Sequence, residues 1–319
     1  MLKLNSISWL HVCYLCIATF SLFSLISCHE NSTPTSIDTN PRLQINIDQL
    51  KNQLIQLPQT GEEYLKPVSR IINNYFEQAL TSSETLQQTI NSLSTNLTQE
   101  NLELSQKALN NAHLMFASGL ALDQCIKIFS TELNDDLSIT QTLDQYPILP
   151  GYLDSVEDYP FSGLIHSDIP LLRTSLIAEF QLGDPLYVTL GFHPLGIILN
   201  GSNNNRNLAD FSELSETIEA NSASPELRRT LYAKLLSEEI LSDLSRLTYD
   251  WINTIQPSLL KMKREESEIL MNRLNNCATK GLNENKPTDH ISNDALQKSN
   301  EWLNQIIKLG IYNTQPGNV

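Results

Sequence analysis

Basic residues are scarce in this chain of 319 residues. It has 21 lysines and arginines against 36 aspartates and glutamates, which gives a formal net charge of -15 at pH 7. A nucleic-acid backbone is bound largely by clustered lysine and arginine, and an acidic surface repels it. The composition therefore argues against nucleic acid as a partner. An acidic excess instead suits solubility and, more weakly, cation binding.

The motifs of several enzyme classes are also missing. The sequence contains no HExxH, GxSxG, GxGxxG or GxxxxGK[ST] pattern. A zinc peptidase with HExxH, a serine hydrolase, and dinucleotide or phosphate-loop binding therefore lack support from their usual motifs. His113, His166 and His290 stand alone in the sequence, without a second ligand at motif spacing.

Glycine is infrequent, with 11 residues, and long apolar runs of β-branched residues are scarce. Apolar residues instead recur every three to four positions, which is typical of amphipathic helices. We predict an all-α fold of two packed helical bundles of the four-helix type, spanning about 45–165 and 170–312. Side-chain oxygens predict helix starts at Ser83, Thr98 and Ser224. The longest predicted helix covers about 102–129.

The first residues have the order of a lipoprotein signal peptide. Lys3 precedes the apolar stretch Val12–Ile26, whose length of about 15 residues is below the ~20 that an α-helix needs to cross a hydrocarbon core. Leu25-Ile26-Ser27-Cys28 resembles the bacterial lipobox. The resemblance implies that residues 1–27 are removed and that the lipid bilayer holds an acylated Cys28.

The segment after Cys28 is polar and rich in serine and threonine. Residues 28–44 are therefore expected to be a flexible tether to the folded body. His29, rather than aspartate, follows the cysteine. This resembles the pattern sorted to the outer membrane, facing the periplasm, in Gram-negative bacteria.

Two of the five cysteines, Cys125 and Cys277, lie in the body of the chain. They can pair in an oxidising compartment, but a large separation in sequence does not show that two cysteines are neighbours. Pairing and free thiols both stay open.

The central region differs from the rest. Four prolines, two glycines and several aromatics interrupt any regular helix from Tyr146 to Pro170. A long irregular segment inside a compact body is more often functional than a simple connection.

This region and the sequence after it contain four blocks in a distinctive order: Pro150–Asp154, Tyr159–Ile165, Gly191–Gly201 and Arg228–Tyr232. The blocks resemble the signatures of the imelysin-like family, and the resemblance extends over roughly residues 45–312. It implies a helical protein of the bacterial envelope. Some members are described as insulin-cleaving metallopeptidases, and others as iron-regulated or iron-uptake proteins.

The motif of this family is GxHxxE, in which an imidazole and a carboxylate point to the same side of a helix. Such a pair can contribute two ligands to zinc or iron. Here His193 is retained, but Gly196 occupies the carboxylate position and has no donor atom. Either another acid substitutes in space or this member has no such site, and His193 then only forms hydrogen bonds at a helix start. The acids considered are Asp154, Asp158, Glu179 and Asp184.

The resemblance also suggests a binding groove near His193, with six candidate residues. For the paired arginines a salt bridge at a helix start is the alternative, and for the aromatic residues it is packing. The candidates are Tyr152, Asp154, Tyr159, Phe161, Arg228 and Arg229.

We therefore expect a non-enzymatic envelope lipoprotein, with no catalytic residue assigned. Its ligand is a metal such as iron or zinc, a haem-related molecule, a peptide or another envelope protein. The alternatives are a metallopeptidase with a replacement ligand and a scaffold that binds no cofactor.

Overall fold

The chain is all-α, as the sequence predicts. No β-strand occurs in the part that the computed structural model describes, and no helix in that part is both long and apolar enough to cross a membrane. The predicted signal peptide, the tether and Cys28 lie outside this part and stay predictions. The described residues are 45–56, 65–127, 139–214, 224–284 and 292–313.

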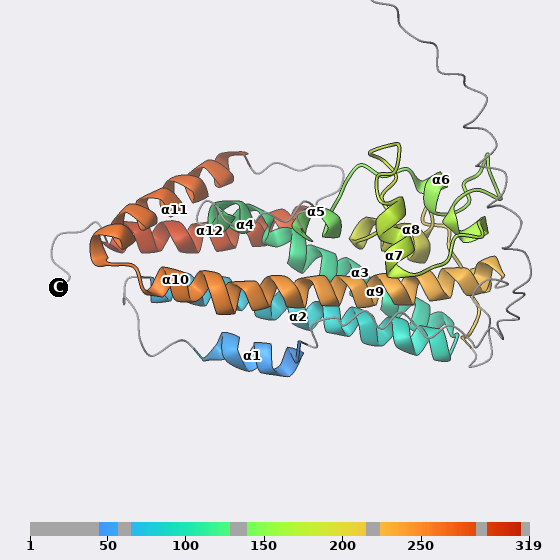
Figure 1. Cartoon of the computed structure of the whole chain (residues 1–319), viewed down its shortest axis with the longest axis horizontal. Coiled ribbons are helices and arrows are strands. Elements are labelled where there is room, and N and C mark those ends of the chain that lie inside the picture. Colours follow the sequence, from blue (N-terminus) through green and yellow to red (C-terminus); the bar gives the residue numbers. More distant parts are fainter. Residues whose placement is uncertain (1–44, 57–64, 128–138, 215–223, 285–291, 314–319) are drawn as a thin grey trace, which may run out of the picture. The chain divides into compact units, whose positions relative to one another are not determined.

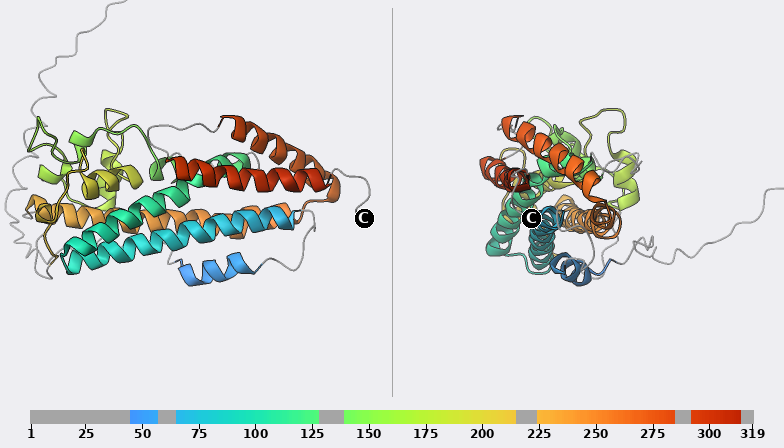
Figure 2. Two further views of the ribbon diagram at one scale, coloured as in Figure 1. Left: turned by 180° about the vertical axis from the view of Figure 1, so that it is seen from behind. Right: turned by 90° about the vertical axis from the view of Figure 1, so that its left-hand side faces the viewer.

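The long helix α2 (Lys66–Thr95) packs against two other long helices, α3 (Gln99–Ser118) and α9 (Pro225–Asp250). The views of Figures 1 and 2 agree that α2 runs beside both α3 and α9. Each helix buries an apolar stripe, and removing such side chains from water is the main stabilising term.

Two of the three predicted helix starts are confirmed. The side chains of Thr98 and Ser224 accept hydrogen bonds from the backbone amides of Asn101 and Leu227, which satisfies amides that have no partner within the helix. The prediction for Ser83 is wrong, because Ser83 is buried in the interior of α2. The apolar stripe of α2 continues on both sides of Ser83, and its burial outweighs the local capping preference.

The helix predicted over about 102–129 is interrupted at Gly119, where α3 ends and α4 (Leu120–Lys127) follows. A Cβ added to Gly119 would lie 2.0 Å from the ring of Tyr75 on α2. The missing side chain therefore allows close contact between α2 and the end of α3. The hydroxyl of Tyr75 then donates a hydrogen bond to the carbonyl of Phe116 at 3.3 Å.

The C-terminal helices lie against the first helices. α12 packs on α3 and α11, and α11 packs on α4. A disulfide between Cys125 and Cys277 joins α4 to α11, which settles the pairing that the sequence left open. The C-terminal elements are the π-helix η4 (Trp251–Ile255), α10 (Gln256–Leu260), α11 (Arg264–Glu284) and α12 (Asn293–Asn313). The first helix, α1 (Ile47–Ile55), packs on α2 and α9.

The described residues from 45 to 313 fall within one compact unit. Helices α2 and α3, expected in a first bundle over about 45–165, pack against α9 and α12, expected in a second over about 170–312. Residues of both α2 and α9 contribute to one hydrophobic core, and the division of the chain into two bundles stays a prediction.

The predicted irregular segment is present between these long helices. In its described part the helices are short, and α8 packs on α3, α6 and α9 (Figure 1). The short elements are α5 (Ile139–Leu143), α6 (Pro150–Leu153), η1 (Leu164–His166), α7 (Arg173–Glu179), α8 (Phe192–Asn200) and η2 (Leu208–Asp210).

Candidate functional site

Helix α8 begins at a glycine that brings two segments close together. Gly191 has φ +98°, and an added Cβ would lie 2.4 Å from the carbonyl oxygens of Thr142 and Leu143. The missing side chain therefore allows the end of α5 to lie against the start of α8. This contact brings Asp144, the residue after α5, beside His193, the second residue of α8.

Three side chains that can bind a metal ion meet at this contact. Nε2 of His113, on α3, lies 2.6 Å from Oδ1 of Asp144, and Nε2 of His193 lies 3.0 Å from the same oxygen. One donor atom from each residue lies within 4.8 Å of the other two. We call His113, Asp144 and His193 the histidine–aspartate cluster.

Aromatic rings pack on both histidines. Phe192, which is buried, stacks on His113, and Tyr146 packs on His193; the ring centroids are 5.1 Å apart in each pair. The exposed fractions of the side chains are 21% for His113, 13% for His193 and 3% for Asp144. The carboxylate is therefore buried, whereas the imidazoles are partly accessible to solvent.

The electrostatics of the cluster favour an ionised carboxylate. Burial by itself raises the pKa of Asp144, but its contacts with His113 and His193 outweigh burial and lower the pKa from 3.8 to about 2. An ionised carboxylate and two imidazoles form a ligand set found in zinc and non-haem iron sites. The cluster therefore fits a first-row transition ion.

The partners of His193 differ from those considered from the sequence. The acid in the cluster is Asp144, and His113 belongs to it as well, although the sequence showed it as isolated. Asp144 precedes the irregular segment, and His113 adjoins the buried stripe of α3, but neither lies at a motif spacing from His193. None of the acids considered belongs to the cluster: Asp154, Asp158, Glu179 and Asp184.

Gly196 leaves one side of the cluster open. It lies three residues after His193, on the same partly exposed face of α8. A Cβ added to Gly196 would meet nothing within 4 Å. A longer side chain would therefore have room here, but glycine itself offers no ligand atom.

Asp154, one of the predicted groove residues, is fully buried in an ion-pair cluster. Its carboxylate accepts hydrogen bonds from Arg206 at 2.6 Å and from Arg229 at 2.7 and 3.0 Å. Burial by itself raises the pKa of Asp154, but the bonds from Arg229 and the charge of Arg206 outweigh burial and lower it. We call these three residues the arginine–aspartate cluster. It joins the end of α6, the loop after α8, and α9.

Arg228, another predicted groove residue, is also buried. Its guanidinium donates hydrogen bonds to the carbonyl oxygens of Leu164, Ile165 and Ile169 at 2.7–3.1 Å. These bonds fasten η1 and the chain after it to α9. The contacts of Arg228 and Arg229 fit the structural interpretation of the paired arginines.

The predicted aromatic residues lie in different surroundings. Tyr152 stacks on Tyr187 with 3.9 Å between ring centroids and donates a hydrogen bond to Glu179. Tyr159 and Phe161 are 68% and 84% exposed. Packing therefore accounts for Tyr152, and the other two lie on the surface.

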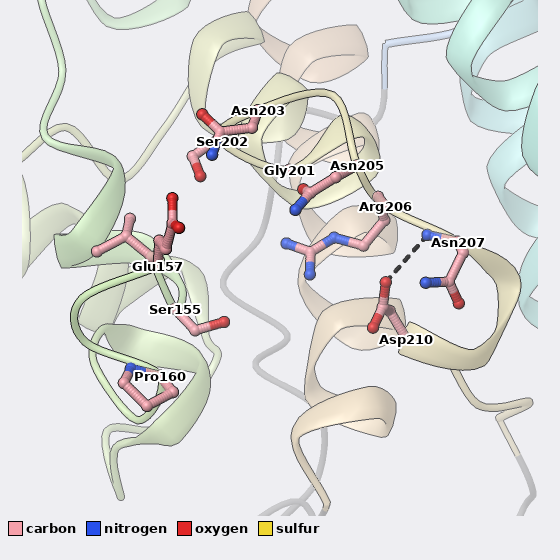
Figure 3. Close-up of a pocket in the computed structure, with 11 residues that line it drawn as sticks. Ser155, Glu157, Pro160, Gly201, Ser202, Asn203, Asn205, Arg206, Asn207 and Asp210 are labelled. Carbon is pink, nitrogen blue, oxygen red and sulfur yellow. Dashed lines mark hydrogen bonds between the residues drawn. The ribbon is translucent and has the colours of Figure 1, made fainter.

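A separate polar cleft of about 570 Å³ lies beside the arginine–aspartate cluster. Figure 3 shows its walls, which come from the chain after α6 and the loop after α8. None of the three potential metal ligands lines it, so it is distinct from the histidine–aspartate cluster. The lining residues are Ser155, Val156, Glu157, Pro160, Gly201, Ser202, Asn203, Asn205, Arg206, Asn207 and Asp210.

The model of the imelysin family matches residues 71–316 of the chain. The chain belongs to the imelysin family. The match includes all three residues of the histidine–aspartate cluster and the arginine–aspartate cluster. A comparison with curated proteins found no match to this imelysin-family chain.

Proposed function

We propose that this member of the imelysin family is a non-enzymatic metal-binding protein of the bacterial cell envelope. The metal is a first-row transition ion such as iron or zinc. The observation that carries the proposal is the convergence of His113, Asp144 and His193 from three separate elements. Two imidazoles and a carboxylate recur in the sites of both metals.

The charges and burial of the cluster support this role. The lowered pKa of Asp144 keeps an anionic oxygen available at neutral pH. The side chains of both histidines are partly exposed, and the packing of Phe192 restrains the ring of His113. Such restraint reduces the entropy lost when a ligand binds.

We favour metal binding over peptide hydrolysis because the cluster has too few carboxylates for a hydrolase. A zinc hydrolase needs an open coordination position and a general base in addition to its ligands. The cluster contains one carboxylate, that of Asp144, and it is required as a ligand. Peptidase activity that depends on metal and on His193 would contradict the non-enzymatic part of the proposal.

We further propose that the protein is held by lipid at Cys28, at the outer membrane facing the periplasm in a Gram-negative host. The lipobox-like sequence before Cys28 supports this location. Labelling with a radioactive fatty acid should be lost in Cys28→Ser. Labelling that persists in this variant would contradict the proposed anchor.

The test of metal binding is calorimetric titration of the purified protein with zinc or, anaerobically, with ferrous iron. We expect one ion per chain, and a loss of affinity of at least about 100-fold in His113→Ala and in His193→Ala, because direct ligands contribute more than the outer residues that typically give 10–100-fold. His166→Ala is the matched control, since His166 lies outside the cluster. Unchanged affinity in both cluster variants would overturn the proposal.

A further inference from the structure

The polar cleft beside the arginine–aspartate cluster has no part in the proposed metal binding. Its volume of about 570 Å³ lies within the range of clefts that bind small molecules. Apart from Val156, Pro160 and Gly201, every lining residue in the described part of the chain has a polar side chain. Such a lining suits a ligand that is polar over most of its surface. It suits neither a lipid chain nor a haem-related molecule.

Hydrogen bonds fix the loop after α8, which forms one wall of the cleft. The guanidinium of Arg206 donates hydrogen bonds to Asp154 at 2.6 Å and to the carbonyl of Ile198 at 3.2 Å. Farther along the loop, the carboxylate of Asp210 accepts a bond from the backbone amide of Asn207 at 3.0 Å (Figure 3). A wall held in this way loses little entropy when a ligand binds.

Exposed side chains on both walls offer both kinds of hydrogen-bonding group. Asn203 and Asn205 are exposed on the loop, and Glu157 is exposed on the opposite wall (Figure 3). An amide side chain both donates and accepts hydrogen bonds, whereas a carboxylate only accepts them. The cleft therefore fits a ligand whose polar groups also donate and accept. The hydroxyl groups of a sugar do both.

The charges of the cleft narrow the ligand further. Glu157 and Asp210 add negative charge to the lining. The positive charge of Arg206 is offset by its ion pair with Asp154. A phosphorylated or sulfated ligand would therefore be repelled. A polyamine would leave the amide N–H groups of the lining without acceptors. We propose that the polar cleft binds a neutral oligosaccharide.

An exposed aromatic residue adjoins the same wall. Tyr159 precedes Pro160, and its backbone exchanges hydrogen bonds with that of Val156 at 2.9 and 3.3 Å. Both of these neighbours line the cleft, and Tyr159 is 68% exposed. An aromatic ring packs well on the apolar C–H face of a sugar ring. We assign Tyr159 as a sugar contact at the edge of the cleft.

The first test is binding of the labelled, purified protein to an array of immobilised glycans. The array carries neutral glucans, mannans and N-acetylglucosamine oligomers, together with sulfated and phosphorylated glycans. We expect neutral glycans to be bound and anionic glycans to be bound less or not at all. Binding of no neutral glycan, or stronger binding of the anionic ones, would overturn the proposal.

Substitutions then test whether the cleft is the binding site. The neutral glycan that gives the strongest array signal is titrated into the protein by calorimetry. Asn203→Ala, Glu157→Ala and Tyr159→Ala should each weaken binding by roughly three- to tenfold, as expected for the loss of one hydrogen bond or one ring contact. Unchanged affinity in the first two variants would overturn the assignment of the cleft. Unchanged affinity in Tyr159→Ala would overturn the role of that residue.

The matched controls are Asn204→Gly and Asp158→Ala, because both residues are exposed neighbours that do not line the cleft. Glycine is used at Asn204 because its φ of +52° would strain an alanine. Both controls should bind like the wild type, and an equal loss in them would contradict the assignment. His193→Ala should also keep its glycan affinity. The failure of this inference is therefore distinct from the failure of the proposed metal binding.

Discussion

Two buried aspartates with lowered pKa values have different partners. Asp144 lies beside two histidines, whereas Asp154 accepts short hydrogen bonds from two arginines and has one histidine, His166, farther away at 3.7 Å. The two clusters lie at opposite ends of α8. His193 is at its start, and Arg206 donates hydrogen bonds to the carbonyl oxygens of Ile197 and Ile198 near its end.

The difference shows that the residue paired with a buried aspartate decides whether the pair can only stabilise the fold or can also bind a metal ion. Arginine keeps its proton in proteins and has no lone pair for a metal, so the arginine–aspartate cluster can only be an ion pair. A neutral imidazole does have a lone pair, so the histidine–aspartate cluster can accept a metal ion in place of protons. We therefore expect changes at Asp154 to affect folding and changes at the histidines to affect metal binding.

The largest expected effect tests this separation at Asp154. Asp154→Asn keeps the shape of the side chain but leaves the charges of Arg206 and Arg229 buried without their anion. Breaking a buried ion pair in this way costs about 3–5 kcal/mol. Urea unfolding should show this loss, and a smaller one in Asp144→Asn. Equal losses in the two variants would contradict the assigned difference.

The second prediction concerns the contact that assembles the histidine–aspartate cluster. Gly191→Ala would place a Cβ 2.4 Å from two carbonyl oxygens and force a shift between α5 and α8. We expect a loss of stability toward the upper end of the roughly 1–3 kcal/mol that backbone strain costs, and weaker zinc binding.

Gly183→Ala is the matched control for Gly191→Ala. Gly183 also has a positive φ, +82°, but an added Cβ there would meet nothing within 4 Å. Both variants therefore carry backbone strain, and only Gly191→Ala carries the steric clash. If Gly183→Ala weakens zinc binding as much as Gly191→Ala, the close contact does not position the cluster.

The sequence predicted the fold class and several helix ends because these depend on local spacing. Apolar periodicity indicated the helices, and Thr98 and Ser224 are caps that bind amides three residues away. The prediction for Ser83 was wrong because a serine before an acidic and an apolar residue looks the same at a helix start and inside a helix. The apolar stripe of α2 continues on both sides of Ser83. The interruption at Gly119 depends on Tyr75, which lies far away in sequence.

The site was predictable only in part, because most of its contacts join residues that lie far apart in the sequence. His193 has a motif around it, whereas His113 and Asp144 reach it through the packing of α3, α5 and α8. Asp154 and Arg229 were placed in a groove because they belong to the blocks that resemble the imelysin-like family. Their mutual ion pair, across 75 positions of sequence, allows both to be buried.

The third prediction uses pH on the apo protein. The pKa of Asp144 is about 2 in the folded chain and 3.8 ordinarily, so its ionised form stabilises the fold above about pH 4, and this contribution is lost as the pH falls toward 2. The shift corresponds to about 2 kcal/mol. The difference in unfolding free energy between wild type and Asp144→Asn should shrink by about this amount over that range. A constant difference would contradict the lowered pKa.

The smallest effects are expected at Gly196, which lies three residues after His193 and has open space where a side chain would be. Gly196→Ala should stabilise the protein by about 0.5–1 kcal/mol, because glycine is unfavourable inside a helix and the added Cβ meets nothing. Its zinc affinity should not change, because alanine adds no donor.

Gly196→Glu adds a carboxylate three residues after His193, on the same face of α8. Calorimetry should show zinc binding tighter by about tenfold, equivalent to about 1.4 kcal/mol. Gly196→Ala is its control for the change in helix propensity. If Gly196→Glu binds zinc no better than Gly196→Ala, the open side of α8 does not face the ion.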